Sequence, residues 1–143
     1  MKMTTGGFEI LRKQFGTLEQ SFVDGVNLVV AESEKEELEY NQTAYVLATA
    51  YHESAGTFLP VKEAYWLSEN WRKQNLRYYP YYGRGLVQIT WKENYSKAGN
   101  KLGYGEQFAN NPDMVMDQDI SVKILVRGSK EGWFTTRKLS DYI

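Results

Sequence analysis

Apolar side chains recur every three or four residues in several parts of the chain, which is the spacing of an amphipathic helix. The stripes consist of Phe8, Leu11 and Phe15; Phe22, Val26, Val29 and Val30; Ala44, Leu47, Ala48 and Tyr51; Tyr95, Ala98 and Leu102; and Ile120, Ile124 and Leu125. The third helix is expected to begin at the N-cap Asn41 and to end near Ser54, before Gly56. The last helix is expected to run to about Lys130.

The region between the third and fourth stripes has no helical period. Residues 57–82 are irregular in pattern and rich in aromatic side chains. From Tyr81 to Ile89 the pattern alternates around two glycines, which predicts a small hairpin or a bent strand. The next helix is expected to open with Thr90 as its N-cap, because Thr90-Trp-Lys-Glu93 is a capping-box sequence. These patterns together predict one α-rich domain with a minor β element, without an internal repeat or a linker.

The composition narrows the kinds of site that the chain can hold. Its 143 residues fit one domain with a real core, and the 15% of aromatic residues include 11 Tyr and 4 Trp. Such side chains suit both cores and sugar-binding clefts, so their number permits carbohydrate binding without requiring it. The chain has no cysteine and one histidine, His52, which excludes thiolate and multi-histidine metal sites. No metal or other cofactor is therefore expected.

The charges are distributed unevenly along the chain. The net charge is −1, but residues 1–60 contain four Lys/Arg against nine Asp/Glu, and residues 61–100 contain seven against three. A basic middle segment would attract an anionic polymer over long range. A solvated surface of mixed charge explains the same counts equally well.

The hydropathy of the chain indicates where it is made. No apolar run approaches the length of a membrane span, so membrane insertion is not expected. Residues 1–8 lack the apolar core of a signal peptide. We expect a protein made in the cytoplasm, which needs a separate release route if its substrate lies outside. A monomer without a nucleic-acid partner is expected.

Two glutamates are the candidates for acid–base chemistry. Glu53 lies in the last turn of the predicted third helix, where the helix dipole and burial both favour a protonated carboxyl, the form that a general acid needs. Glu63 follows ten residues later and Glu69 is its rival on the same segment. An inverting glycosidase needs a second carboxylate about 6.5–9.5 Å from the acid, to activate a water molecule. Taken singly, each of these glutamates fits an exposed surface charge better than a catalytic role.

Several polar residues nearby have two interpretations each. Gln88 and Asn94 carry amides that can bind N-acetyl or hydroxyl groups. His52 fits a satisfied core histidine as well as a ligand contact. Thr90 fits the N-cap of its helix as well as a role in the site.

Three ordered runs of sequence change the weight of these signals. They are Ala44-Tyr-Val-Leu-Ala-Thr-Ala-Tyr-His-Glu53-Ser-Ala-Gly56, Tyr82-Gly-Arg-Gly-Leu-Val-Gln-Ile-Thr-Trp91, and Asn94-Tyr95. In this order they closely resemble glycoside hydrolase family 19, and within it the compact phage and prophage endolysins. Further segments similar to these enzymes are Leu18–Leu28, Asn111–Asp113, Gly132–Thr135 and Lys138–Tyr142. The resemblance therefore covers nearly the whole chain.

This resemblance implies a fold and a set of site residues. The fold is a mainly α, lysozyme-like bilobal domain over residues 1–143, with a small β-hairpin and a central cleft. By position, Glu53 matches the general acid and Glu63 the second carboxylate, while Thr90 matches the hydroxyl residue that helps to hold the attacking water. The matching positions for binding the sugar chain are His52, Gln88 and Asn94, together with Tyr82 and Arg84 of the second run.

The chain departs from the family at its C-terminal end. Family members usually continue beyond the segment that matches Leu139–Ile143, with an Asn-Gly turn and an arginine near the second carboxylate. This chain stops at Ile143. We therefore expect a domain that is truncated relative to the family, or one with a reduced cleft.

Four functions fit these observations. The first is an endolysin-type glycosidase that cleaves β-1,4 bonds of bacterial peptidoglycan by an inverting mechanism; the second is a chitinase that uses the same mechanism. The small size, the lack of cysteines and the lack of a signal peptide favour the first. The third is a non-catalytic module that binds the cell wall, and the fourth is a structural domain that shares only the fold.

Overall fold

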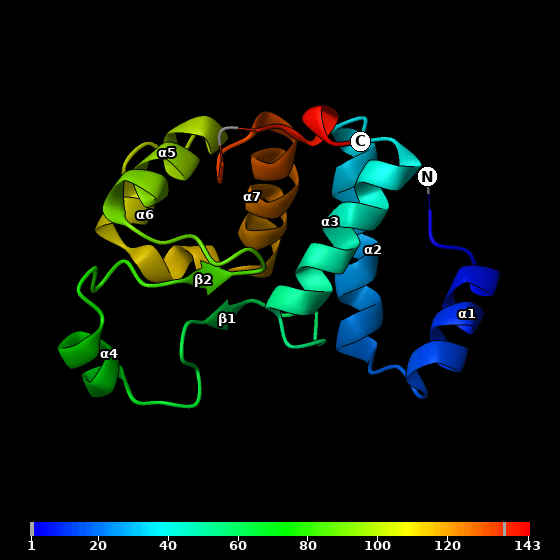
Figure 1. Cartoon of the computed structure of the whole chain (residues 1–143), viewed down its shortest axis with the longest axis horizontal. Coiled ribbons are helices and arrows are strands. Elements are labelled where there is room, and N and C mark those ends of the chain that lie inside the picture. Colours follow the sequence, from blue (N-terminus) through cyan, green and yellow to red (C-terminus); the bar gives the residue numbers. More distant parts are fainter. Residues whose placement is uncertain (1, 136) are drawn as a thin grey trace.

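Helices dominate the structure, a computed structural model that describes residues 2–135 and 137–143 (Figure 1). The α-helices are α1 (Thr5–Phe15), α2 (Gln20–Lys35), α3 (Tyr40–Glu53), α4 (Glu69–Asn75), α5 (Lys92–Leu102), α6 (Gln107–Asn110) and α7 (Gln118–Glu131). Two short strands, β1 (Val61–Lys62) and β2 (Arg84–Gly85), lie between α3 and α5 in the chain, with α4 separating them. The 3₁₀ turns are η1 (Pro112–Met116) and η2 (Leu139–Asp141).

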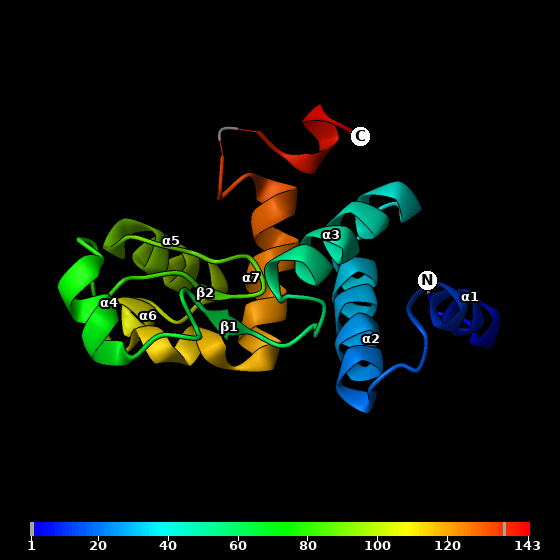
Figure 2. The ribbon, with the colours of Figure 1, turned by 60° about the horizontal axis from the view of Figure 1, so that its bottom comes forward.

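The helices surround two hydrophobic cores that share α7. The first core joins α2 and α3 to α7, through buried residues that include Val26, Val46 and Leu125. The second core joins α5, α6 and η1 to the same helix, through buried residues that include Phe108 and Ile124. Figures 1 and 2 show these two groups of helices on opposite sides of α7. The predicted mainly α, bilobal class is confirmed.

The small sheet lies where the two groups meet. Strands β1 and β2 pair antiparallel, with Val61 opposite Gly85 and Lys62 opposite Arg84. The predicted local hairpin exists only as a single bridge between Arg84 and Ile89. The main partner of β2 is instead β1, in a segment that the pattern marked as irregular, because two paired residues are too few to produce an alternating pattern.

Helix boundaries differ from the predictions where the chain turns sharply. α3 begins at Tyr40 with Glu39 as N-cap, and the side chain of Gln42 accepts the Glu39 N–H at 3.1 Å, so Asn41 is not the cap. The short helices α4 and α6 were not predicted.

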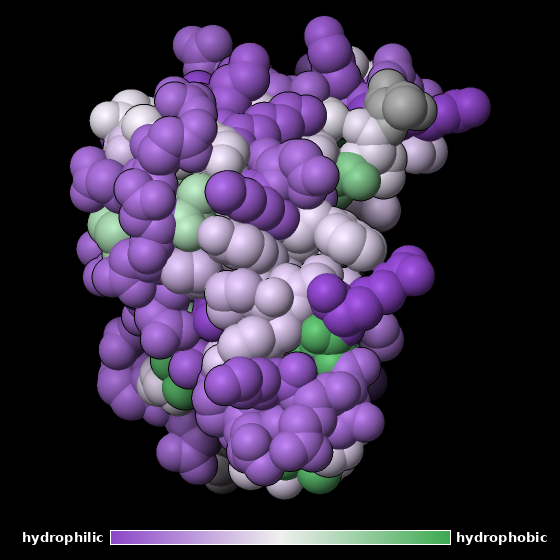
Figure 3. All heavy atoms as spheres, turned by 90° about the vertical axis from the view of Figure 1, so that its left-hand side faces the viewer, coloured by the Kyte–Doolittle hydropathy of each residue, from purple (hydrophilic) through white to green (hydrophobic). Residues whose placement is uncertain are grey.

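Of the helices in the described residues, none is both long and apolar enough to cross a bilayer. The face formed by α4, α5 and α6 is mostly hydrophilic, with a paler band across its middle (Figure 3).

A close contact between α2 and the loop after α3 fixes how the chain leaves α3. A Cβ on Gly25 would lie 2.5 Å from the Cβ of Phe58 and 2.8 Å from its carbonyl oxygen. Phe58 is buried, has a left-handed φ of 59°, and donates its N–H to Ser54 Oγ at 2.9 Å. Only glycine at position 25 allows this close approach. The contact holds Phe58 in place, and Phe58 lies in the sequence between the two predicted catalytic glutamates.

Gly25→Ala should therefore lower the free energy of unfolding by about 1–3 kcal/mol, because the added methyl group overlaps Phe58. Helix propensity alone favours Ala over Gly by up to about 1 kcal/mol, so packing and propensity predict opposite signs. Urea denaturation followed by circular dichroism measures the difference.

Gly6→Ala in α1 is the matched control, since its new Cβ would lie 3.7 Å from the nearest atom, Thr4 Oγ1. This variant should be as stable as the wild type or slightly more stable. If Gly25→Ala is equally stable, Phe58 moves freely and the close contact does not constrain the loop.

Candidate active site

Glu53 is the last residue of α3, and its side chain is half-buried. The C-terminal end of α3 lies beside the two-stranded sheet in both ribbon views (Figures 1 and 2). Among residues 2–135 and 137–143, no donor or cation pairs with the Glu53 carboxyl group. The next residue, Ser54, is fully buried and anchors Phe58. Glu53 thus combines a fixed backbone with a carboxyl group that is available to a ligand.

Glu63 follows β1 directly and is held by hydrogen bonds on both carboxylate oxygens. The Gly83 N–H donates to Oε1 at 2.9 Å, and the Tyr78 hydroxyl donates to Oε2 at 2.5 Å. The Glu63 N–H donates in turn to the Gly83 carbonyl at 2.7 Å. A Cβ on Gly83 would lie 2.6 Å from Gln88 Oε1 and 3.3 Å from Glu63 Oε1, so a larger residue there would disturb this arrangement.

Tyr78 is a site residue that the sequence analysis missed. Burial, together with its hydrogen bond to Glu63 and the negative charge there, raises the pKa of Tyr78 to about 12. The phenol therefore stays protonated and remains a donor at any pH near neutral. The signal was present as four tyrosines within Tyr78–Tyr82, but their separate roles could not be inferred from composition.

Glu69, the rival for the second carboxylate, is held by structural contacts at the start of α4. Its oxygens accept from Tyr79 at 2.8 Å, from Tyr82 at 2.9 Å and from Arg72 at 3.3 Å. Burial alone would raise the pKa of Glu69, but these hydrogen bonds and the charges of Lys62 and Arg72 lower it below its ordinary value. The contacts tie α4 to the Tyr79–Tyr82 segment.

Tyr82 and Arg84, predicted to bind substrate, are buried, with only 0% and 4% of their surface exposed. The guanidinium of Arg84 lies 3.8 Å from the centre of the Tyr82 ring, donates to Asp113 at 3.0 Å and to the Tyr95 hydroxyl at 3.0 Å. Side chains with so little exposed surface offer no face to a sugar in this conformation. The prediction of direct contact does not fit this burial, and both residues instead support the turn that carries Gly83.

Thr90 lies half-buried before α5, and its predicted role as N-cap is wrong. The N-cap is Trp91, whose left-handed φ of 71° turns the chain so that α5 starts at Lys92. The Thr90 carbonyl accepts the Asn94 side-chain N–H at 2.8 Å, while the Thr90 hydroxyl makes no hydrogen bond within the described part of the chain. This hydroxyl is thus available to a ligand or to water.

The remaining predicted sugar-binding residues differ in how available their side chains are to a ligand. His52 and Asn94 are exposed. Gln88 is half-buried, and its amide N–H groups donate to the Val61 carbonyl at 2.8 Å and the Gly85 carbonyl at 3.1 Å. Gln88 therefore braces the sheet and has only its amide oxygen available for other contacts.

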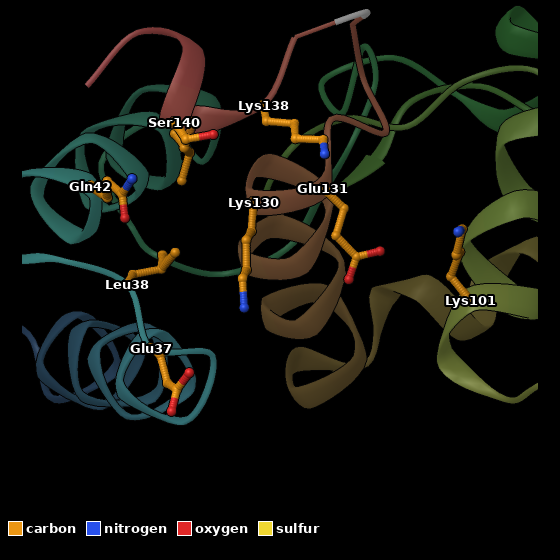
Figure 4. A pocket seen from close by; sticks show the side chains of 9 residues that line it. Glu37, Leu38, Gln42, Lys101, Lys130, Glu131, Lys138 and Ser140 are labelled. Atoms are coloured by element: carbon orange, nitrogen blue, oxygen red, sulfur yellow. The ribbon is translucent and has the colours of Figure 1, made fainter.

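A cavity of about 480 Å³ lies away from these residues (Figure 4). Its walls come from the connection between α2 and α3, from the C-terminal ends of α5 and α7, and from residues 138–140. Lys101, Lys130 and Lys138 line it together with Glu131. None of the predicted catalytic or sugar-binding residues contributes to its walls, so it is separate from the candidate active site.

Parts of this chain are similar in sequence to known proteins. An acidic 26 kDa endochitinase of Solanum lycopersicum is 47% identical over 47 residues, which are 32% of this chain and 19% of that protein. Endochitinase EP3 of Arabidopsis thaliana is 30% identical over 109 residues, or 71% of this chain and 37% of that protein. The chain thus spans only a small part of these relatives.

A crystal structure of a mutant chitinase C aligns over 89% of this chain and 57% of its own, with 22% identity and a TM-score of 0.49. The family profile of glycoside hydrolase family 19, described as chitinase class I, matches residues 36–137, which include both runs around Glu53 and Thr90. This match covers most of the chain. The chain therefore belongs to glycoside hydrolase family 19.

Proposed function

We propose that this protein hydrolyses β-1,4 bonds of an N-acetylhexosamine polymer by an inverting mechanism. Glu53 donates a proton to the glycosidic oxygen as the bond to the anomeric carbon breaks. Glu63 takes a proton from a water molecule that attacks the same carbon from the opposite face. The observation that supports this most is the contrast between the two carboxyl groups. Within residues 2–135 and 137–143, Glu53 has no hydrogen-bond or ion-pair partner, whereas Glu63 accepts a hydrogen bond on each oxygen.

The two hydrogen bonds to the Glu63 carboxylate leave acceptor sites free for a water molecule. A carboxylate has about four lone-pair sites, and Gly83 and Tyr78 occupy one on each oxygen. Both donors are uncharged and fix the orientation of the group, and within the described residues no cation forms an ion pair with this carboxylate. The carboxylate therefore remains able to accept a proton in this proposal. The Thr90 hydroxyl is a second ligand for the same water in this proposal. His52, Asn94 and the amide oxygen of Gln88 are the proposed polar contacts to the sugar chain.

Bacterial peptidoglycan is the substrate that we favour, in an endolysin-type role after release of the protein to the cell wall. Exposed cations, including Lys73 and Arg77, lie on and just after α4, and these suit a polymer with anionic groups. Chitin is the second candidate, because the relatives reported above are named endochitinases. Incubation with purified peptidoglycan and, separately, with chitin oligomers, followed by mass spectrometry of the products, distinguishes the two. Binding without any product would favour a non-catalytic wall-binding module.

Glu53→Gln and Glu63→Gln should each lower turnover by about 10²–10⁴-fold or more, because an amide neither donates the acidic proton nor accepts one from water. Substrate binding should persist in both variants. Release of soluble sugar from the better of the two polymers measures turnover, and thermal melts check the fold. Activity within threefold of wild type in a folded Glu53→Gln variant would remove this residue from the mechanism.

Glu69→Gln is the control on the same segment. Since Glu69 supports α4 through its tyrosine and arginine contacts, this variant should melt at a lower temperature and keep most of its turnover when folded. A loss of turnover larger than that of Glu63→Gln would assign the second carboxylate to Glu69.

The stereochemistry of the product tests the mechanism independently of any single residue. A single displacement by water inverts the anomeric carbon, so a β-linked substrate should first release the α-anomer. Proton NMR within minutes of mixing, before mutarotation, detects it. Initial release of the β-anomer would indicate a covalent intermediate and carboxyl groups about 5–5.5 Å apart.

Tyr78→Phe should lower kcat by roughly ten- to a hundredfold, because the Oε2 atom of Glu63 loses the donor that orients it. The pKa of Tyr78 is about 12, so the phenol donates throughout the working range. The loss should accordingly not grow as the pH rises from 7 to 9, because the wild-type phenol keeps its proton throughout this range. A loss that appears only at alkaline pH would contradict this role.

A further inference from the structure

Two aromatic side chains, two and three residues after Glu63 in the sequence, project into solvent. Trp66 is 71% exposed and Tyr65 is 60% exposed. Their ring centres lie 5.2 Å apart with an interplanar angle of 89°. Scattered exposed apolar side chains are ordinary, but a paired tryptophan and tyrosine with this much free surface beside a candidate active site calls for an explanation.

The turn that carries this pair is held rigidly. Arg72 is buried and donates from Nε to the Glu63 carbonyl at 2.8 Å and from Nη2 to the Ala64 carbonyl at 3.0 Å. The Leu67 N–H donates to the same Ala64 carbonyl at 2.9 Å. Ala64 has a left-handed φ of 52°, which is unfavourable for a residue with a Cβ. This strained conformation is held in place by the surrounding contacts, and it directs the next two side chains away from the core.

The chemistry of the pair suits a sugar ring. Tryptophan and tyrosine offer flat apolar faces with a polar edge, which match the C–H face and the hydroxyl groups of a pyranose. Trp66 follows Glu63 by three residues, so their Cα atoms lie within about 11 Å of each other. A glycan of several sugar units with its scissile bond at Glu63 is long enough to reach this point. A protein partner would need about 800 Å² of matching surface, whereas the neighbours Ser68 and Asn70 are exposed and polar.

We propose that Tyr65 and Trp66 form a further subsite that stacks against a sugar ring of the bound polymer, next to the bond that is cut. This subsite rests on the proposed glycosidase function, since its ligand is the same β-1,4-linked N-acetylhexosamine chain. Trp66 contributes most of the contact area and Tyr65 supports its ring edge-on. The residues add affinity without taking part in proton transfer.

Binding is measured by isothermal titration in the Glu53→Gln background, so that no substrate is consumed. The probes are an N-acetylglucosamine hexamer and soluble peptidoglycan fragments. Trp66→Ala should raise Kd by about tenfold, and Trp66→Phe should restore most of the loss, because a flat ring remains. In the active enzyme, Trp66→Ala should raise KM and change kcat by less than about twofold.

Tyr40→Ala is the matched control. Tyr40 is 78% exposed but begins α3, about 20 Å along the helix from Glu53, so its loss should leave Kd unchanged. A Kd for folded Trp66→Ala within twofold of its parent would overturn the subsite while the glycosidase function stands. Near-normal turnover in Glu53→Gln, or no binding of either probe by the parent, would overturn the proposed function and the subsite with it.

Discussion

A buried arginine is the constraint on which the middle of this molecule depends. Arg84 has almost no contact with water, and an unpaired charge in that position would be strongly destabilising. Its guanidinium is satisfied by Asp113, by the Tyr95 hydroxyl and by the Pro80 carbonyl at 2.8 Å, and it stacks on Tyr82. These partners come from three separate parts of the chain. Satisfying one charge therefore brings together η1, α5 and the segment before β2.

The candidate active site is built outward from that arrangement. Because Arg84 is fixed, Gly83 presents its N–H and carbonyl groups to Glu63 in a fixed direction. A second buried arginine, Arg72, holds the backbone on the far side of Glu63. The two buried arginines thus fix the backbone on both sides of this carboxylate. Within the described residues, neither arginine forms an ion pair with the carboxylate itself. Its orientation is set by backbone and phenol donors rather than by a neighbouring positive charge.

The sequence predicted the elements whose pattern is long enough to be read. α2, α3 and α7 each extend over 14 or more residues and carry several turns of apolar stripe. α4 and α6 have seven and four residues, too few to show a period. Thr90 was predicted as a cap because local sequence rules do not include the left-handed turn at Trp91. Glu53 was predicted from an ordered motif and Glu63 from its position between two such motifs, and both roles stay predictions. Tyr78 was missed because its partner lies 15 residues away and only folding brings them together.

The shared helix α7 has a consequence for how such a protein changes over generations. It packs on α2 and α3, and its buried Ser121 accepts the Leu86 N–H at 2.8 Å beside β2. The positions of the helix that bears Glu53 and of the turn that supports Glu63 therefore both depend on α7, which carries neither residue. We expect small changes of side-chain volume along α7 to alter the distance between the carboxyl groups of Glu53 and Glu63. In the proposed mechanism, selection can therefore adjust the reaction rate through positions on α7 that do not contact the substrate.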